Sequence, residues 1–436
     1  MEMDVEKRTL RKLKWRIVPF IMVLYLIAYL DRVNLGFAAL TMKEDLGFTA
    51  SVLGLGAGIF FIGYFLFEVP SNIILHKVGA RIWIARVMVT WGLIAGGMAF
   101  IESTTSFYVM RFLLGVAEAG FFPGIILYLA YWFPARHRAG VVALFMAAAP
   151  IATAVGSPIS AALLELHGVL GFAGWQWMFV LEALPAVVLG VVVLFYMTDR
   201  PEKAKWLQQD EREWLVKTMQ AEEASKQNGQ KNHSILRGLA NPRVLALALI
   251  YFGTSAGLYT LGIWAPQIIK DLGVSSMTVG ILNAIPPILS VIAMVLWSRH
   301  SDRTNERTWH VAIACLVAAS GLIIATFTHS IVGLIAALVI VNVGISCAKP
   351  PLWSMPTMFL SGAAAATGIA TINSIGNLGG FFGPAMIGYI HDVTGSFNGG
   401  LYFVAGLLIL STVLTIVLSM TSSKVQSAPT HETSKV

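Results

Sequence analysis

The sequence predicts an all-α membrane protein with twelve transmembrane helices in two six-helix halves and with cytoplasmic N- and C-termini. The 436 residues are 56% hydrophobic and only 12% charged, whereas soluble domains carry about 25% charged residues. The mean hydropathy is +0.73. Apolar runs of about 20 residues recur along the chain, which excludes a barrel, because barrel strands alternate apolar and polar residues.

Twelve apolar runs are long enough to cross a bilayer as helices. The first run is too long for a cleavable signal peptide and contains Asp31 and Arg32. In chain order the predicted spans cover about 17–42, 51–75, 81–101, 106–133, 140–165, 175–197, 244–268, 275–297, 310–328, 331–358, 365–390 and 399–420.

The distribution of lysine and arginine predicts the orientation of the spans. Of the 30 basic residues, 24 fall in the two termini or in connections that share one side. The opposite side holds only Lys43 and Lys270. Both termini are therefore expected in the cytoplasm. The net charge of +7 is scattered over loops, so the sequence offers no patch for nucleic acid.

One long polar connection divides the chain. We expect a first half over residues 1–197, a cytoplasmic linker over 198–243, a second half over 244–422 and a cytoplasmic tail over 423–436. Within the linker, residues 202–219 are predicted to form an amphipathic surface helix and residues 222–233 a flexible segment.

The two halves carry signs of a repeat. Arg81 and Arg307 follow corresponding spans and are separated by 226 residues, and Pro158 and Pro384 are separated by the same number. One offset at two unrelated places indicates duplicated halves, as in transporters whose substrate binds between parallel repeats.

Residues 111–124 place an arginine and a glutamate, Arg111 and Glu118, two helical turns apart within one span. A charge at the centre of a spanning helix costs ~3 kcal/mol on insertion scales, so it faces a cavity or a partner. We interpret this stretch as half of a binding and coupling site. The alternative is a buried structural ion pair.

Helix geometry brings further polar residues to the same depth. At 1.5 Å per residue, Asp31 lies ~16 Å, Glu118 ~18 Å and Tyr64 ~20 Å from the outer surface. Burial favours a protonated carboxylate and a nearby arginine opposes it. A substrate anion that engages the arginine would therefore favour protonation of the acid, so that anion and proton bind together.

Eight segments spread over nearly the whole chain resemble one known family. They are LDRVN (30–34), EVPSN (68–72), RFLLGVAEAGFFPG (111–124), YWFP (131–134), GWQW (174–177), WSRHSDR (297–303), WSMP (353–356) and INSIGN (372–377). The sequence resembles the major facilitator superfamily, in particular its anion:cation symporter branch of bacterial organic-acid transporters. Within that branch it is similar to carriers of tartrate, rhamnonate-type sugar acids and 4-hydroxyphenylacetate.

The resemblance implies roles for single residues. It assigns proton coupling to Asp31 and Glu118. It assigns substrate binding to Arg111 and to a set of polar and aromatic residues, Tyr29, Tyr64, Trp353 and Asn373. We add Arg32, which adjoins Asp31, and Asn377, one turn after Asn373.

Each of these assignments has a structural alternative. Asp31 and Arg32 could form a structural pair, the aromatic residues could be packing residues, and the two asparagines could bridge helices. Lys349 precedes Pro350-Pro351, which should break its helix, and it either contacts substrate or reaches toward the cytoplasm. Glu68 and Glu182 are expected to be structural, and His391-Asp392 to be a solvated helix end.

Loop residues that follow the second and eighth spans are expected to act in gating: Arg81, Asp302, Arg303 and Arg307. In the first copy His76 and Lys77 stand where the family has an acidic residue and an arginine, so a latch built on an acidic residue is less certain there.

The expected function is import of small organic acid anions of the tartrate or sugar-acid type by proton symport with alternating access. The alternatives are import of an aromatic acid such as 4-hydroxyphenylacetate, or anion exchange or export. No serine–histidine, metal-spaced or nucleotide-loop constellation supports an enzyme. We expect no cofactor or metal, Cys315 and Cys347 as packing residues, a monomer, and a multi-pass location in a bacterial inner membrane.

Overall fold

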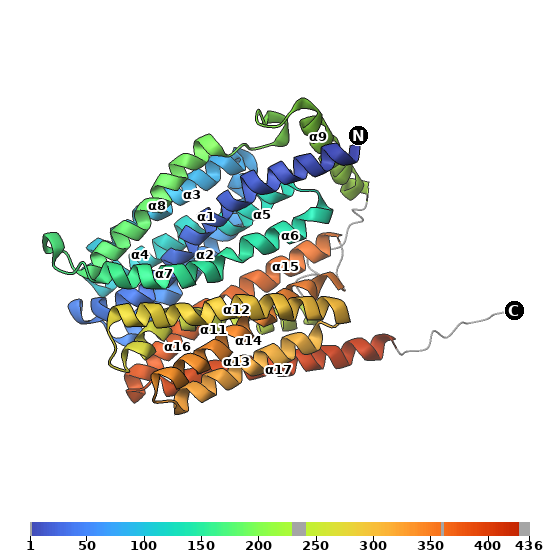
Figure 1. The fold of residues 1–436 in the computed structure, drawn as a ribbon. Helices are drawn as coiled ribbons and strands as arrows, with labels where there is room; N and C mark the ends of the chain where they lie inside the picture. Colours follow the sequence, from blue (N-terminus) through green and yellow to red (C-terminus); the bar gives the residue numbers. More distant parts are fainter. Residues whose placement is uncertain (1, 229–240, 359–361, 427–436) are drawn as a thin grey trace.

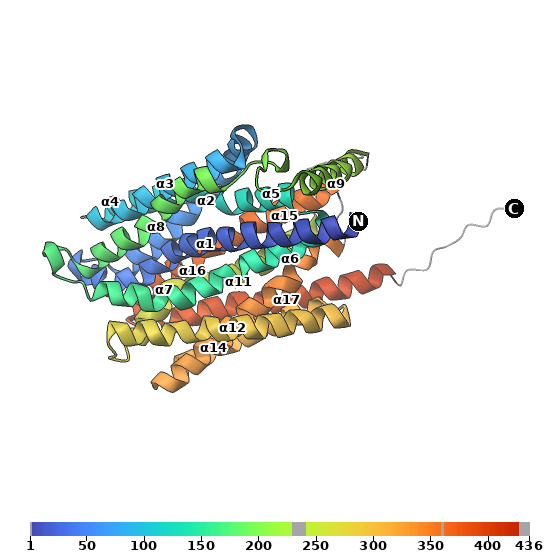
Figure 2. The ribbon, with the colours of Figure 1, turned by 45° about the horizontal axis from the view of Figure 1, so that its top comes forward.

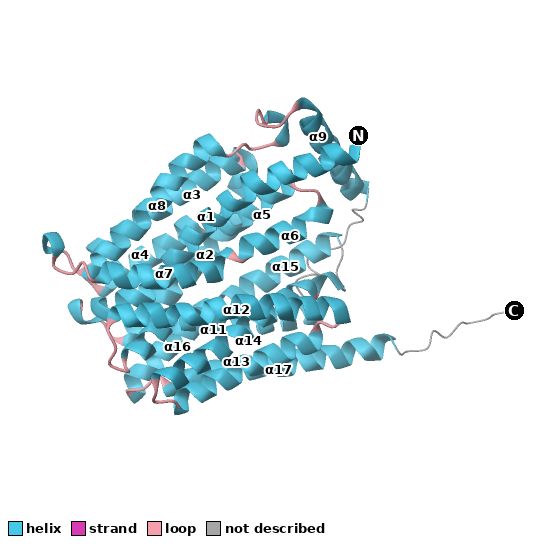
Figure 3. Cartoon of the chain, viewed as in Figure 1, coloured by secondary structure: helices cyan, strands magenta, loops and turns pink. Residues whose placement is uncertain are grey.

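The computed structural model describes residues 2–228, 241–358 and 362–426, and all regular secondary structure in these ranges is helical (Figure 3). The helices gather into a first half, α1–α8, and a second half, α11–α17, which lie against each other (Figures 1 and 2). Helix α1 begins and α17 ends at the same end of the molecule (Figure 1). We call this the termini end and the opposite one the distal end.

The first half follows the predicted spans closely. Its elements are α1 (Glu2–Asp45), α2 (Ala50–Val78), α3 (Ala80–Gly97), η1 (Met98–Phe100), α4 (Thr104–Glu118), α5 (Phe121–Trp132), α6 (Ala135–Met146), α7 (Ala148–Leu164), η2 (Val169–Gly171) and α8 (Gly174–Tyr196). The short η3 (Pro201–Lys203) and helix α9 (Gln209–Asn228) follow.

The second half has the same character. Its elements are α11 (Pro242–Lys270), α12 (Ser276–Thr304), α13 (Thr308–Phe327), α14 (Ile331–Ser354), η4 (Pro356–Met358), α15 (Gly362–Asn377), α16 (Gly379–Thr394) and α17 (Asn398–Gln426).

Eleven stretches within the described ranges are long and apolar enough to cross a membrane. The remaining expected span, 365–390, coincides with α15 and α16, two helices of 16 residues that meet at Leu378. Two other spans are interrupted, between α4 and α5 and between α6 and α7. The expectation that Pro350-Pro351 breaks its helix was wrong, because α14 continues through both prolines. Neighbouring helices compensate for lost backbone bonds in such positions.

Helix α9 is fastened to the first half by ion pairs (Figure 1). The buried carboxylate of Glu211 accepts hydrogen bonds from Arg8 and Lys12 of α1, both at 2.9 Å. Glu222 pairs with Arg138 at 2.9 Å. The prediction of a flexible segment over 222–233 was therefore wrong for residues 222–228, whose helix is held by these contacts; residues 229–233 lie outside the described ranges.

The halves touch along α2 with α16, α7 with α12, and α1 with α11. A Cβ at Gly54 would lie 2.4 Å from the carbonyl oxygen of Pro384, and a Cβ at Gly280 would lie 3.2 Å from the Cα of Pro158. Gly54 and Gly280 differ by 226 residues, as do Pro158 and Pro384. The two contacts are thus equivalent under the repeat, and glycine is needed at both because the backbones almost touch.

At the distal end Asp392 of α16 caps α2. Its carboxylate accepts hydrogen bonds from the backbone N–H groups of Ala50 at 3.0 Å and Ser51 at 2.8 Å. The N-terminus of a helix carries unpaired N–H donors and a partial positive charge, so an anion stabilises it. The expectation that His391-Asp392 is only a solvated helix end was wrong for Asp392, which closes the distal end between the halves.

Candidate functional site

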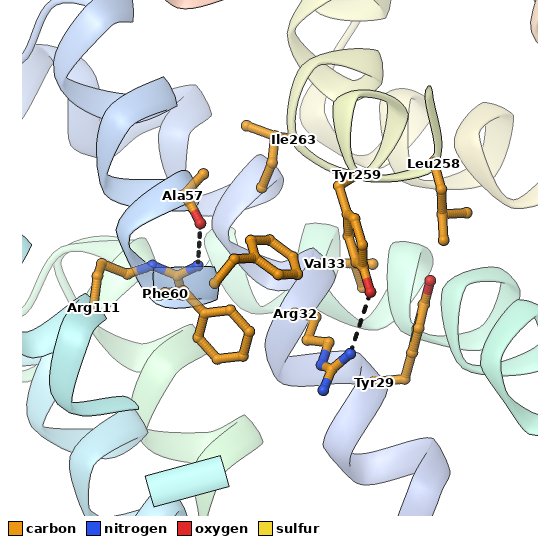
Figure 4. A pocket seen from close by; sticks show the side chains of 11 residues that line it. Tyr29, Arg32, Val33, Ala57, Phe60, Arg111, Leu258, Tyr259 and Ile263 are labelled. Atoms are coloured by element: carbon orange, nitrogen blue, oxygen red, sulfur yellow. Dashed lines mark hydrogen bonds between the residues drawn. The ribbon is translucent and has the colours of Figure 1, made fainter. Parts of the chain in front are cut away.

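A cavity lies between the halves, lined by α1, α2, α4 and α11 (Figure 4). Its volume is about 20 Å³, room for about one water molecule. An organic acid of several carbon atoms enters only if the lining side chains or the halves move apart. The lining residues are Tyr29, Arg32, Val33, Ala57, Phe60, Phe61, Arg111, Leu258, Tyr259, Gly262 and Ile263.

Arg32 is bound to Glu118. Its Nη2 lies 2.5 Å and its Nε 2.7 Å from Oε1 of the carboxylate. On the cavity side it donates a weaker hydrogen bond, at 3.4 Å, to the hydroxyl of Tyr259 in the other half (Figure 4). Both members of the pair are largely buried, so removing one would leave an uncompensated charge away from water.

The position of Glu118 follows from a break in its span. Helix α4 ends at Glu118, and Gly120 adopts a φ of +89° before α5 begins. Only glycine takes this left-handed conformation without strain. A Cβ at Gly120 would also lie 2.1 Å from the Ser71 hydroxyl oxygen. The glycine therefore ends α4 directly after the carboxylate.

Arg111 has a different environment. Its Nε donates to the carbonyl oxygen of Gly56 at 3.1 Å, and its Nη2 is 3.5 Å from that of Ala57 (Figure 4). Within the described ranges it makes no salt bridge, although it is 3% exposed. Sequence reasoning expected Arg111 to face Glu118, but the carboxylate takes Arg32 instead. Arg111 is thus a buried cation at the cavity wall whose charge is not balanced by a direct acidic partner.

Asp31 points away from the cavity. Its Oδ2 accepts a 2.5 Å hydrogen bond from Trp91 Nε1, and its Oδ1 a 3.3 Å bond from the amide of Asn34. Asp31 and Arg32 are adjacent on one helix and therefore project in different directions. The structure gives Asp31 to the interior of the first half and Arg32 to the interface between halves.

The other predicted binding residues surround this centre. Tyr64 is buried, and the guanidinium carbon of Arg32 lies 5.4 Å from its ring centroid. Trp353 packs against Tyr251 at 4.9 Å between ring centroids, and it does not line the cavity. Asn373 donates a 3.1 Å hydrogen bond to Glu68 of the other half. Asn377 is the last residue of α15 and is half-buried.

The predicted gating residues lie near the termini end. In the first half Arg81 has an acidic partner after all: Asp199 accepts from the backbone N–H of Arg81 at 2.9 Å and lies 3.5 Å from its guanidinium Nε. Sequence reasoning missed it because it is 118 residues away. In the second half Asp302 pairs with Arg307 at 2.6 Å, and Arg303 is exposed.

Sequence reasoning missed Phe60 and Tyr259. The ring of Phe60 lies between both guanidinium groups, 5.6 Å from Arg32 and 5.2 Å from Arg111 (Figure 4). Such contacts stabilise cations away from water. Tyr259 stands 226 residues after Val33, which also lines the cavity. Transferring the neighbourhood of Arg32 through the repeat would have pointed to Tyr259.

The arrangement suits an anion with hydroxyl groups. Two guanidinium groups offer paired donors for carboxylate oxygens, and the hydroxyls of Tyr29 and Tyr259 belong to opposite halves. Among the residues that the structure describes, no group of three or more His, Cys, Asp and Glu side chains could hold a metal ion.

Comparisons with known proteins give the family. Residues 21–384 match the model of the Major Facilitator Superfamily. The chain is 72% identical over 422 residues to a protein of Agrobacterium vitis named "Putative tartrate transporter", with 97% of both chains covered. It is 41% identical over 418 residues to the "Quinolone resistance transporter" of Acinetobacter baumannii, with 95% of this chain and 96% of the relative covered.

A solved structure shares the fold. The crystal structure of a bacterial homolog to the human lysosomal transporter Spinster, in an inward-facing and occupied conformation, aligns with a TM-score of 0.76 at 15% identity. The alignment covers 95% of this chain and 98% of the other. The chain belongs to the major facilitator superfamily: it is a multi-pass membrane transporter and not an enzyme.

Proposed function

We propose that the protein imports a small organic acid anion of the tartrate or sugar-acid type by proton symport with alternating access. The substrate binds in the cavity between the halves, with Arg111 as the receptor of one carboxylate. Glu118 is the proton acceptor, and Arg32 links the two events. The similarity to the proteins of Agrobacterium vitis supports the substrate class.

One observation carries this proposal: two arginines share the cavity, but only one has an acidic partner. An incoming carboxylate binds the unpaired Arg111 and attracts Arg32 as well. As Arg32 turns toward the substrate, Glu118 loses its counter-ion in a buried place. A buried carboxylate without a counter-ion favours its protonated form. Anion binding thereby draws in a proton.

The proposed topology has twelve spans, with α15 and α16 together crossing the membrane once, and with the termini end in the cytoplasm. The boundaries are those of the sequence prediction: 1–197, 198–243, 244–422 and 423–436. We place the protein as a monomer in the inner membrane of a bacterial cell. A protease-cleavable N-terminal tag should be cut in inverted membrane vesicles and should resist the protease in intact spheroplasts.

The distal end is closed in this structure by the Asp392 cap and by the close backbone contacts of α2 with α16 and of α7 with α12. The Glu68–Asn373 hydrogen bond joins the halves on the other side of the cavity. We infer that transport alternates between loosening of these two sets of contacts, one at a time.

Uptake of labelled tartrate into proteoliposomes tests the function. With the outside acidified, tartrate should accumulate against its gradient, and dissipating the pH gradient should abolish the accumulation. Unlabelled tartrate isomers, a six-carbon sugar acid, 4-hydroxyphenylacetate and a quinolone serve as competitors.

The competitors decide between the substrate classes. Competition by hydroxy acids alone supports the proposal, and competition by 4-hydroxyphenylacetate alone moves the substrate to aromatic acids. Downhill exchange without response to pH indicates an exchanger. Quinolone-specific competition with outward transport indicates an exporter, as the name of the Acinetobacter baumannii relative suggests for that protein.

A further inference from the structure

A second buried acid lies beside Asp31. Glu182 of α8 is 3% exposed, and Asp31 and Asn34 of α1 are each 2% exposed. Ser160 of α7 completes the group and is fully buried. None of these four residues lines the cavity. Carboxyl groups are rarely buried in a helix bundle unless they are paired or functional.

Asn34 connects the two acids. Its Nδ2 donates to Oδ1 of Asp31 at 3.3 Å, and its side chain is also within hydrogen-bonding range of Glu182. Ser160 donates to Oε1 of Glu182 at 2.6 Å. The amide therefore bridges two carboxyl groups.

Two buried oxygens in this group have no donor: Oδ1 of Asn34 and Oε2 of Glu182. Buried polar atoms without partners are rare in folded proteins. An amide presents one donor side and one acceptor side. Because its donor side is turned to Asp31, its acceptor oxygen can be satisfied only by a group that donates, and an ionised Glu182 cannot. A proton on Oε2 of Glu182 would satisfy both atoms.

The charges around the acids lead to the same result. The charged groups that act on Asp31 and Glu182 are the two acids themselves and, from α4, Glu118 and Arg111. Arg32 is taken by Glu118, and neither Asp31 nor Glu182 has a salt bridge within the described ranges. Two adjacent buried carboxylates without a bound cation cannot both be ionised at small cost.

We propose that Glu182 carries a proton in this state and, through the Asn34 amide, holds a hydrogen-bond donor on the ionised Asp31. Glu182 is thus a positioning residue for the proton-coupling acid. Reversing the amide would require the proton to be on Asp31 instead, so the bridge allows one proton for the two acids. This inference rests on the proposed function of Asp31 as a coupling group, but the proton on Glu182 can be tested without transport.

Infrared spectroscopy of the purified protein in detergent at neutral pH gives that direct test. The carbonyl band of a protonated carboxylic acid should be present in the wild type and should lose intensity in Glu182→Gln. Glu211→Gln is the matched control, since Glu211 is also buried but is paired with Arg8 and Lys12; it should leave the band unchanged. A Glu182→Gln spectrum with the full band intensity overturns the inference whatever the substrate is.

The pH profile of uptake tests the positioning role. Glu182→Gln keeps a donor for Asn34, so its pH midpoint should match that of the wild type. Glu182→Leu and Asn34→Leu remove the donor to Asp31, which destabilises the ionised form, so their midpoints should move to higher pH by a similar amount. The double variant should show no larger shift, since both changes break one chain of bonds.

Two outcomes contradict the role. An unchanged midpoint in Glu182→Leu would mean that Glu182 does not act through Asn34. Loss of proton-driven accumulation in Glu182→Gln would mean that Glu182 itself releases its proton during the cycle. If Glu182→Leu fails to fold, the Gln variant and the infrared band still decide the question.

Discussion

The Nη2 atom of Arg32 lies 2.5 Å from Oε1 of Glu118, and this ion pair joins α1 to α4 directly beside the cavity between the halves. The same guanidinium reaches Tyr259 in the other half. A change at Glu118 is therefore felt by the group that contacts the second half, which links protonation to the relative position of the halves.

Glu118→Gln should uncouple the proton from the substrate. Glutamine keeps the shape and can still accept from Arg32, but it cannot take up a proton. Accumulation of substrate under a pH gradient should be lost, while counterflow exchange, which needs no net proton movement, should continue. Glu102→Gln, in an exposed loop, is the control and should behave like the wild type. Normal accumulation in Glu118→Gln would show that Glu118 is not the coupling group.

Arg111→Lys should weaken substrate binding. Lysine keeps the charge but loses the planar fork that holds a carboxylate through two parallel hydrogen bonds. We expect the dissociation constant to rise about tenfold or more, which is about 1.4 kcal/mol. Calorimetry on purified protein measures it. Arg86→Lys is the matched control, because Arg86 stacks on Trp83 at 4.0 Å and does not line the cavity. Equal affinities for wild type and Arg111→Lys would leave Arg32 as the anion receptor.

Asp392→Asn should favour opening of the distal end. An anion at a helix N-terminus is worth about 0.3–1 kcal/mol, so the open population should rise up to about fivefold. Spin labels on Glu102 and His329, exposed residues of the two halves at this end, report the separation. Asp45→Asn is the control, since Asp45 accepts from Trp175 within the first half at 2.8 Å. Identical distance distributions in Asp392→Asn and wild type would remove the cap from the gating account.

Acid should release α9 from α1. Burial raises the pKa of Glu211, but hydrogen bonds from Lys12, the Gln208 amide and Arg8 outweigh it, so that the pKa lies below the ordinary value. A lowered pKa in the folded state contributes stability above the unfolded pKa, and this is lost as the pH falls through the folded pKa. Hydrogen exchange of α9 should therefore accelerate in that acidic range and be fast already at neutral pH in Glu211→Gln. Protection in the variant equal to wild type would contradict the contact.

Much of the fold could be predicted because it depends on the bilayer. Spans of about 20 apolar residues and the charge asymmetry of the loops are local properties, and they gave the helices nearly as observed. The breaks at Gly120 and Leu378 were not predicted, since a glycine within an apolar run can equally serve close packing. The helical path through Pro350-Pro351 depends on neighbours that no local pattern reveals.

The layer of the site was predictable, but its pairing was not. Rise per residue brought Asp31 and Glu118 to one depth, and adjacency put Arg32 beside them. Which arginine meets Glu118 depends on the packing of α2 on α4, where a Cβ at Gly115 would lie 2.0 Å from the carbonyl oxygen of Phe60. That close approach brings the carbonyl groups of Gly56 and Ala57 to Arg111, and it leaves Glu118 to Arg32.

The most direct test of coupling counts the protons taken up when substrate binds. Titration calorimetry of the purified protein with tartrate, in buffers of different ionisation enthalpy, gives this number. The account predicts about one proton per bound anion for the wild type at neutral pH, and about none for Glu118→Gln. Binding of tartrate to the wild type without proton uptake, or equal uptake by Glu118→Gln, would contradict it.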